Sequence, residues 1–488
     1  MYDFDKPINR QGTHCVKWDM APHSAPEGAT ARPEGTLSER SGERTLNSQL
    51  STLNSQMIPL WVADMDFEAA PAIREALKKR VEHGVFGYAI VQDSYYDAVI
   101  NWYERRHQWH IEREWIQYTT GVVPAISAVI KALTMPGERV LIMTPVYNCF
   151  FSSIRNNGCE VLESKLVPVS CAPTQEAASP TLTYEVDWDD FERKCADEKC
   201  TVFLLCNPHN PAGRVWTREE LQRMNDICQR HHVRIISDEI HCELTMPGYE
   251  FVPMGRLAPQ TPTPNPSPRE GSLDTFPPDD ATSKAIQTPL PRGDWGLQSS
   301  HQCGCGPTKG SESPIRDGGQ AGGGLPIICC SPSKSFNTAG LQMANIICAD
   351  AETRRRIDRA ININEICDVN PFAPLAVEAA YNESEDWIDE LNQYLWGNYQ
   401  ALLAFFAEQL PQLKVFKLEG TYLVWVDITA LGVSADEIEE KLLREARVWV
   451  NSGTMYGADG YIRINIATQR ARLMEGLKRM ARVLAIAP

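Results

Sequence analysis

The sequence predicts an α/β fold, in which a mostly parallel sheet with helices on both faces is followed by a smaller α+β region. Two observations carry this prediction. Between residues 122 and 348, short apolar runs alternate with helix-like segments, which is the rhythm of βαβ units. The runs are continuously apolar rather than alternating, as is typical of strands buried on both faces.

The elements of the first region follow in order. Val122–Leu133 comes after a Thr-Thr-Gly turn and has the composition of a helix. Thr217 and Glu220 form a capping box, which opens a second helix that runs to about His231. Strands are expected at residues 139–143, 201–206, 233–237, 325–330 and 345–348.

From about Ala351 the pattern changes to long amphipathic helices, such as residues 387–409, mixed with strands at 423–427 and 461–466. We therefore expect an ordered arm at residues 1–20, a large domain at 57–350 and a small α+β domain at 351–488.

Three segments interrupt this pattern, at residues 21–56, 169–181 and 257–324. They are rich in small and polar residues, and the first contains the direct repeat Thr-Leu-Asn-Ser-Gln. Such segments bury too little apolar surface to offset the entropy of ordering them. Their glycine runs do not end in Gly-Lys-Ser/Thr, so they are not phosphate loops. We expect disordered insertions without chemistry.

The composition excludes several classes of function. The chain has 488 residues, 43% of them hydrophobic, and a formal net charge of −16. This acidity disfavours nucleic acid or an anionic membrane as the main partner, and no apolar run could span a bilayer. The first residues lack the apolar core of a signal peptide, and the 15 cysteines fall mostly in strand-like runs. We expect a cytoplasmic protein with reduced thiols and no metal site.

Lys334 follows the strand-like run Ile-Ile-Cys-Cys and lies among small residues. The carboxyl ends of buried strands are where open α/β sheets build their sites. Burial there favours the neutral amine, which attacks carbonyl groups and forms Schiff bases. Alone, the pattern fits an exposed loop lysine equally well, so the rest of the chain must decide.

Four further stretches lie where a phosphate-bearing cofactor would need them. Thr-Thr-Gly-Val-Val at residues 119–123 opens a helix whose first amides are free to bind a phosphate. Asn-Pro-His-Asn-Pro-Ala-Gly at 207–213, Ser-Asp-Glu-Ile-His at 237–241 and Tyr147 each follow a strand. Singly, each is more often a turn, a cap or a packing residue. Together they indicate one chemistry.

These stretches, with Pro-Leu-Trp-Val-Ala-Asp-Met-Asp-Phe at 59–67 and Ser-Pro-Ser-Lys-Ser-Phe-Asn at 331–337, resemble fold-type I pyridoxal-phosphate enzymes. More narrowly, they are similar to the cystathionine β-lyase or cysteine–sulfur lyase branch of the class I/II aminotransferases. The resemblance covers nearly all of the chain outside the three insertions. It implies the aminotransferase-like fold, with a seven-stranded sheet in the large domain, and pyridoxal 5'-phosphate as the cofactor.

The resemblance also implies roles for the residues that hold the cofactor ring. Lys334 would bind the cofactor as an internal aldimine, and Asp238 would pair with the ring nitrogen and keep it protonated. Asn210 would donate to the phenolic oxygen, and His241 stands where many aminotransferases place a tyrosine with the same task. Tyr147 would stack on the ring.

For the phosphate, the resemblance implies a cradle made by the amides of Val122 and Val123 together with Ser331 and Ser333. Tyr88 matches a tyrosine that reaches the phosphate of a neighbouring subunit. The resemblance therefore implies a homodimer with shared active sites.

Arg463 matches the arginine that binds the substrate α-carboxylate in a bidentate manner, which lysine does poorly. Without the resemblance, an arginine between Ile462 and Ile464 fits a surface position as well. Many aminotransferases carry an arginine eight residues after the lysine. Here that residue is Gln342, which fits the lyase branch better.

The implied reaction is α,β-elimination, in which Lys334 removes the Cα proton and a cysteine thioether such as cystathionine yields a thiol, pyruvate and ammonia. Transamination uses the same residues and stays open. Residues 331–334 mimic the Ser-x-x-Lys of penicillin-binding proteins, but Ser-Asp-Asn and Lys-Thr-Gly are absent. Residues 241–243 mimic the zinc-deaminase His-x-Glu, but Pro-Cys-x-x-Cys is absent. A pure interaction protein leaves the cofactor residues unexplained.

Overall fold

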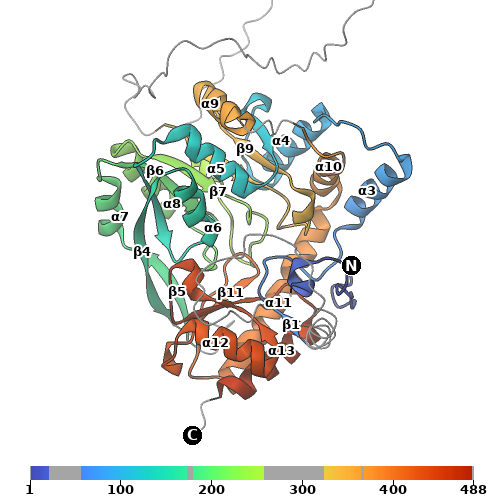
Figure 1. Ribbon diagram of the computed structural model, residues 1–488, viewed down its shortest axis with the longest axis vertical. Helices are drawn as coiled ribbons and strands as arrows, with labels where there is room; N and C mark the ends of the chain where they lie inside the picture. Colours follow the sequence, from blue (N-terminus) through green and yellow to red (C-terminus); the bar gives the residue numbers. More distant parts are fainter. Residues whose placement is uncertain (1, 21–56, 173–179, 258–323, 364–367, 486–488) are drawn as a thin grey trace, which may run out of the picture. The chain divides into compact units, whose positions relative to one another are not determined.

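The computed structural model describes residues 2–20, 57–172, 180–257, 324–363 and 368–485 (Figure 1). All of these residues belong to one compact unit. The expected insertion at 21–56, nearly all of 257–324 and the middle of 169–181 lie outside the described residues.

The large sheet has eight strands in the order β2-β9-β8-β7-β6-β3-β4-β5. The ladders from β8 through β4 are parallel, whereas β2, β9 and β5 pair antiparallel with their neighbours. The prediction of a mostly parallel sheet is therefore confirmed. In chain order the strands are Ile116–Thr119 (β2), Arg139–Thr144 (β3), Glu160–Cys171 (β4), Thr181–Val186 (β5), Cys200–Cys206 (β6), Arg234–Asp238 (β7), Ile327–Cys330 (β8) and Ala344–Ile347 (β9).

The sheet has one strand more than the seven expected, because β4 is long enough to serve two ladders. Its first half pairs in parallel with β3, and its second half continues past β3 and pairs antiparallel with β5. Residues 169–171 and Thr181, which the sequence pattern places in an insertion, belong to this hairpin. This part of β4 mixes exposed with half-buried positions, so it lacks the continuous apolar run by which the other strands are predicted.

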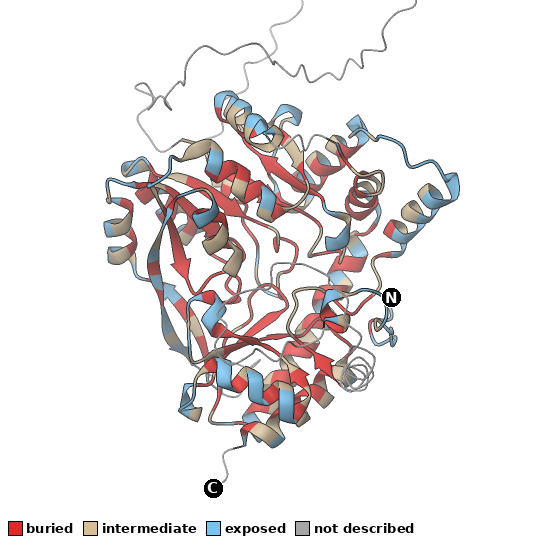
Figure 2. Cartoon of the chain, in the orientation of Figure 1, coloured by how far each residue is buried: buried red, intermediate tan, exposed pale blue. Residues whose placement is uncertain are grey.

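Helices cover both faces of this sheet, as predicted. The strands alternate, so that Val140 and Ile142 join one apolar cluster and Leu141 and Met143 the other. One face is covered by α5 (Val122–Leu133), α6 (Asn148–Asn156) and α9 (Ala351–Asn362), and the other by α4 (Asp93–His107), α7 (Trp188–Cys195), α8 (Arg218–Arg230) and α10 (Ala373–Glu383). The central strands are mostly red in Figure 2, which marks them as buried.

Local signals set several of these boundaries. The predicted capping box is present at the start of α8, since Thr217 accepts from the Glu220 amide and the Glu220 carboxylate accepts from the Thr217 amide. Helix α3 (Pro71–His83) begins with a proline and ends at Gly84, whose φ of 75° is the left-handed conformation that favours glycine.

The second region contains a four-stranded antiparallel sheet in the order β10-β11-β14-β13. Its strands are Lys414–Val415 (β10), Leu423–Asp427 (β11), Asn451–Ser452 (β13) and Tyr461–Asn465 (β14). The helices here are α11 (Glu385–Gln409), α12 (Ala435–Lys441) and α13 (Arg470–Leu484). The predicted helix at 387–409 and strands at 423–427 and 461–466 are confirmed.

Short elements connect the N-terminal part of the chain to its C-terminal part. The N-terminal arm contains α1 (Val16–Asp19), and β1 (Ile58–Pro59) pairs in parallel with β12 (Val448–Trp449). Helix α9 packs on α5, and α10 packs on α3 and α4, so both helices belong to the layers around the large sheet. The division into two domains at residue 351 stays a prediction. None of the helices in the described ranges is long and apolar enough to cross a membrane.

Candidate active site

The predicted site residues converge because four parallel strands end at the same edge of the large sheet. Asp238 is the last residue of β7, and Lys334 lies in the turn that follows β8. Asn210 lies in the turn after β6, and Tyr147 lies between β3 and α6. Parallel neighbours bring their carboxyl ends together, which is where open α/β sheets bind ligands.

Lys334 lies in this edge with its amine partly buried and turned toward the segment at residues 61–67. Its Nζ donates to the Ala63 carbonyl at 2.6 Å. Burial lowers the pKa of Lys334, and the positive charge of Arg463 lowers it further, while Asp64 and Asp238 act in the opposite direction. The net shift is toward the neutral amine, which is the nucleophilic and basic form.

Asp238 is 3% exposed and accepts a hydrogen bond from the Ile240 amide at 3.2 Å. Burial raises the pKa of Asp238 to about 7, although the Ile240 N–H and the charge of Lys334 act to lower it. Within the described chain the carboxyl group has no ion-pair partner. A cationic ring nitrogen placed beside it would supply the missing charge and favour the carboxylate.

Arg463 lies on β14 and reaches the same edge from the small sheet. Its Nη1 donates to Asn210 Oδ1 at 3.2 Å and its Nη2 donates to the Trp61 carbonyl at 2.8 Å. Its guanidinium lies over the Tyr456 ring, and its buried Nε has no hydrogen-bond partner among the described residues. All of its partners are neutral, so this buried cation can accept an anion.

His241 follows the end of β7 and is buried, with a ring centroid 6.1 Å from that of Tyr422. Burial, followed by the charges of Lys334 and Arg463, lowers the pKa of His241 to about 3. The imidazole is therefore neutral, and its buried Nδ1 has no partner in the part of the chain that the structure describes. It is free to hydrogen-bond a ligand.

The first turn of α5 carries two of the residues predicted to bind the cofactor phosphate. The amides of Val122 and Val123 are the first two of the helix and have no helical acceptor, and Pro124 follows them without an N–H. The Ser331 hydroxyl donates to the Met343 carbonyl at 2.5 Å and accepts from the Ser333 amide at 3.1 Å. Its hydrogen is thus already directed to the protein, and its role toward a phosphate stays a prediction.

The two tyrosines predicted for the site, Tyr147 and Tyr88, differ in their surroundings. The half-buried Tyr147 stands at the N-cap position of α6 without a capping hydrogen bond, and burial raises its pKa well above the ordinary value. Tyr88 is 93% exposed, in the segment between α3 and α4, and contributes nothing to the site of its own chain. Its predicted role lies in a neighbouring subunit and stays a prediction. Gln342, the residue eight positions after the lysine, is exposed.

Sequence reasoning missed the contribution of the backbone at residues 61–67 and of Tyr422. The carbonyl of Ala63 accepts from both Lys334 Nζ and the Tyr422 hydroxyl, the latter at 2.9 Å. The carbonyl of Trp61 accepts from Arg463. The motif at 59–67 marks this segment, but a carbonyl has no sequence signature. Tyr422 lies within an apolar strand pattern, where a tyrosine is most simply a core residue.

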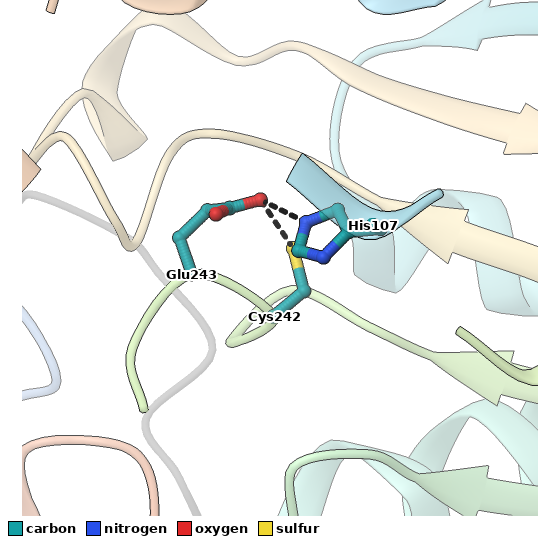
Figure 3. Close-up of side chains that lie close together, drawn as sticks. All are labelled: His107, Cys242 and Glu243. Carbon is teal, nitrogen blue, oxygen red and sulfur yellow. Dashed lines mark hydrogen bonds and ion pairs between the residues drawn. The ribbon is translucent and has the colours of Figure 1, made fainter. Parts of the chain in front are cut away.

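A second buried cluster lies beside the site. Figure 3 shows His107, Cys242 and Glu243, whose potential ligand atoms all lie within 4.8 Å of one another. Glu243 accepts from His107 at 2.7 Å and from the Trp102 indole at 2.7 Å, and Arg106 lies 3.6 Å from its other oxygen. Burial acts to raise the pKa of Glu243, but His107 and Arg106 lower it to about 2. This carboxylate is already paired, so we assign the cluster to structural support of the turn after His241.

Comparisons with known proteins agree with this geometry. The family model described as aminotransferase class I and II matches residues 55–262 and 310–480. The chain belongs to the class I and II aminotransferase family. The curated protein "Cystathionine beta-lyase PatB" of Bacillus subtilis is 32% identical over 485 residues, which cover 99% of this chain and 100% of that protein. "Protein MalY" of Escherichia coli is 27% identical, over 98% of this chain and 97% of its own length.

The solved structure of cystalysin from Treponema denticola, which contains pyridoxal 5'-phosphate, is 27% identical and superposes with a TM-score of 0.74 over 99% of each chain. The protein is therefore a pyridoxal-phosphate enzyme of fold type I, from the branch that contains PatB and MalY.

The residues of the site fit this cofactor. Asp238 is a buried carboxyl without a cation, as a ring nitrogen requires. His241 Nδ1 is a buried polar atom that awaits a partner, and the first amides of α5 offer donors to a phosphate. The Lys334 amine, which now donates to the Ala63 carbonyl, is the group predicted to bind the cofactor aldehyde. These assignments of single residues stay predictions, which the experiments below test.

Proposed function

We propose that the protein is a carbon–sulfur β-lyase that acts on cysteine thioethers such as cystathionine. The observation that carries the proposal is the set of Lys334, Asp238 and Arg463, which meet at one sheet edge without an ion-pair partner in the described chain. The description of PatB as a cystathionine beta-lyase supports the choice of reaction.

Arg463 binds and orients the substrate. Its present acceptors, Asn210 Oδ1 and the Trp61 carbonyl, are neutral, so an α-carboxylate replaces them with a stronger, charge-assisted pair. Asn210 is then left to donate its amide hydrogens elsewhere in the site. This fixed carboxylate places the substrate Cα near Lys334 rather than letting it rotate.

Lys334 moves the proton. Its neutral amine accepts the Cα proton, and the Ala63 carbonyl, 2.6 Å from Nζ, holds the nitrogen in place. Bound pyridoxal phosphate would supply an electron sink for the charge that develops at Cα, and Asp238 is the residue that would hold its ring nitrogen. The Cβ–S bond then breaks, and the thiolate leaves with the electron pair of that bond. With one water, each thioether yields one thiol, one pyruvate and one ammonium ion.

The test uses the purified holoenzyme with L-cystathionine and no keto-acid acceptor, and follows pyruvate and free thiol. We expect sustained release of both in equal amounts. If pyruvate stays absent and turnover requires an added keto acid, the enzyme is an aminotransferase, which the same residues would also serve, and the proposal is wrong.

We also propose that the active form is a homodimer in the cytoplasm. Tyr88 belongs to an exposed segment in which Val85, Phe86 and Ile90 are also more than half exposed, and such an apolar patch is typical of an interface. Mixing inactive Lys334→Ala and Tyr88→Ala variants should restore part of the activity if sites are shared between subunits. A monomeric mass by light scattering, with no restoration, would argue against the dimer.

A further inference from the structure

Glu239 is a fully buried carboxyl group for which the proposed reaction has no use. It follows Asp238 directly, is 0% exposed, and its amide donates to the Cys329 carbonyl at 2.8 Å. Its Oε1 accepts from the Ser237 hydroxyl and from the Met254 amide, both at 2.9 Å. Its Oε2 is buried and has no hydrogen-bond partner among the described residues.

The charges around Glu239 do not favour an anion. No lysine, arginine or histidine of the described chain forms an ion pair with it. The titratable groups that act on it or feel its charge come from β7 and the turn after it, from α4 and from β8, and each is neutral or negative: Asp238, Cys242, Tyr103, Cys329 and Cys330. An ionised carboxylate with one unpaired oxygen is costly in such surroundings.

Asn207, directly after β6, also has a buried side-chain oxygen without a hydrogen-bond donor among the described residues. Its Nδ2 donates to the Val252 carbonyl at 3.1 Å, which fixes the orientation of the amide. Its Oδ1 is buried without a donor in the described part of the chain, and its side chain interacts with the Glu239 carboxyl group. Each of the two side chains therefore has one buried acceptor without a donor in the described chain, and one hydrogen shared between them would satisfy both.

We propose that Glu239 is held as a neutral carboxylic acid whose Oε2–H donates to Asn207 Oδ1. One proton then satisfies both unpartnered atoms. The acid links the end of β7 to the turn that carries Asn210 and, through Met254, to the segment after His241. Burial, which raises the pKa of Glu239 to about 8, agrees with this protonation state, although Met254, Ser237 and Asn207 act to lower that pKa.

This makes Glu239 a positioning residue, and its consequence for the cofactor rests on the proposed function. Asp238 and Glu239 are consecutive carboxyl groups, and the charge of each opposes ionisation of the other. If Glu239 carries its proton permanently, Asp238 is the one carboxyl at this sheet edge that can ionise beside a cationic ring nitrogen.

The direct test is infrared difference spectroscopy on the cofactor-free protein at pH 6. A protonated carboxylic acid has a carbonyl stretch well separated from carboxylate bands. We expect this band in the Asp238→Asn variant, which removes the other raised carboxyl group, and expect it to vanish in Asp238→Asn/Glu239→Gln. If the double variant and its parent give the same spectrum in this region, Glu239 is ionised and the proposal is overturned.

A second test is rescue by an isostere. Gln is a neutral match for the acid: its carbonyl accepts from Ser237 and Met254, and its amide donates to Asn207. We expect Glu239→Gln to keep or exceed the wild-type Tm at pH 6, and Glu239→Ala, which leaves these partners unpaired, to lower it. An equal loss in both variants would overturn the proposal.

A third test follows how the Tm difference between Glu239→Gln and wild type changes with pH. A carboxyl group with a raised pKa keeps its proton in the folded state up to about pH 8, whereas the unfolded chain releases it near its ordinary value, so folding loses stability as pH rises between the two. Glu239→Gln lacks this loss, and its Tm relative to wild type should rise from pH 6 to pH 9. A constant difference contradicts the proposal. All three measurements are made on cofactor-free protein, so their failure leaves the lyase assignment untouched.

Discussion

Two groups of buried charges lie close together in this chain and are partnered in opposite ways. In the first, which we call the arm cluster, Arg10, Lys17 and Arg472 surround Asp64 and Asp66. Asp66 lies 2.9 Å from Arg10, 3.1 Å from Lys17 and 3.4 Å from Arg472. In the second, Lys334, Asp238 and Arg463 form hydrogen bonds to neutral groups and no ion pair within the described residues.

The pKa values follow this difference. Burial acts to raise the pKa of Asp66, but Lys17, the Trp18 indole and Arg472 lower it to about 2, so it stays charged. Burial of Asp238 is not compensated in this way, and its pKa rises to about 7. The arm cluster is complete without a ligand and holds the N-terminal arm on residues 61–67. The site is incomplete, which is the mark of a place where a ligand supplies the missing charges.

The largest difference in turnover is expected between variants of two lysines, Lys334 of the site and Lys17 of the arm cluster. Lys334→Ala should reduce turnover by about 10³-fold or more, because it removes both the nucleophile and the base. The visible absorbance of the bound cofactor should disappear with it. Lys17→Met, the matched control, should lower stability and keep the absorbance. Retained turnover in Lys334→Ala would remove Lys334 from its role.

The second largest difference is expected in the stability of variants of the two buried aspartates, Asp66 and Asp238. Asp66→Asn should destabilise the cofactor-free protein by about 3–5 kcal/mol in urea unfolding, because three cations lose their shared anion. Asp238→Asn should leave stability unchanged or raise it, since it removes an uncompensated carboxyl group, yet it should weaken cofactor binding. Equal destabilisation by both would break the comparison.

The same pair has opposite pH dependences. The pKa of Asp66 is lowered on folding, so its contribution is present above its unfolded value and is lost as pH falls toward about 2. The pKa of Asp238 is raised on folding, so its carboxyl group stabilises the folded state less as pH rises toward about 7. The stability gap between the two variants should therefore widen from pH 4 to pH 7.

The two arginines, Arg463 and Arg472, should differ less, and the difference concerns substrate binding. A hydrogen-bonded charge pair contributes about 1.5–3 kcal/mol. Arg463→Ala should raise KM by about 10- to 100-fold with less change in kcat, and Arg463→Lys should recover only part of the loss. Arg472→Ala, from the arm cluster, should change KM little. An unchanged KM in Arg463→Ala would exclude the carboxylate role.

The smallest effect is expected at Tyr422, whose hydroxyl shares the Ala63 carbonyl with Lys334. Tyr422→Phe should cost about 0.5–1.5 kcal/mol of stability. It should also leave the carbonyl a stronger acceptor for the charged amine, which raises the pKa of Lys334 and shifts the acidic limb of the pH–rate profile upward. A profile identical to that of wild type would mean that the hydroxyl serves packing alone.

The sequence by itself determined the central strands of the large sheet and the polar residues that follow them. Continuous apolar runs predicted β3, β6, β7 and β8 because burial on both faces leaves no alternation to confuse the pattern. Parallel strands end at one edge of a sheet. Because Asp238, Asn210 and Lys334 each follow one of those runs, the sequence alone predicts that they lie close together.

Only the tertiary structure decided how these groups are partnered. Arg463 could have been a surface arginine, and it is the antiparallel pairing of β14 with β11 and β13 that carries it to the site. The hairpin of β4 and β5 stayed hidden because ladder hydrogen bonds, and not an apolar run, define it. How a charged group is partnered depends on groups that lie far apart in the sequence, as with the Lys334 amine and the main-chain carbonyl of Ala63. That distance-dependent energy has no local sequence signal.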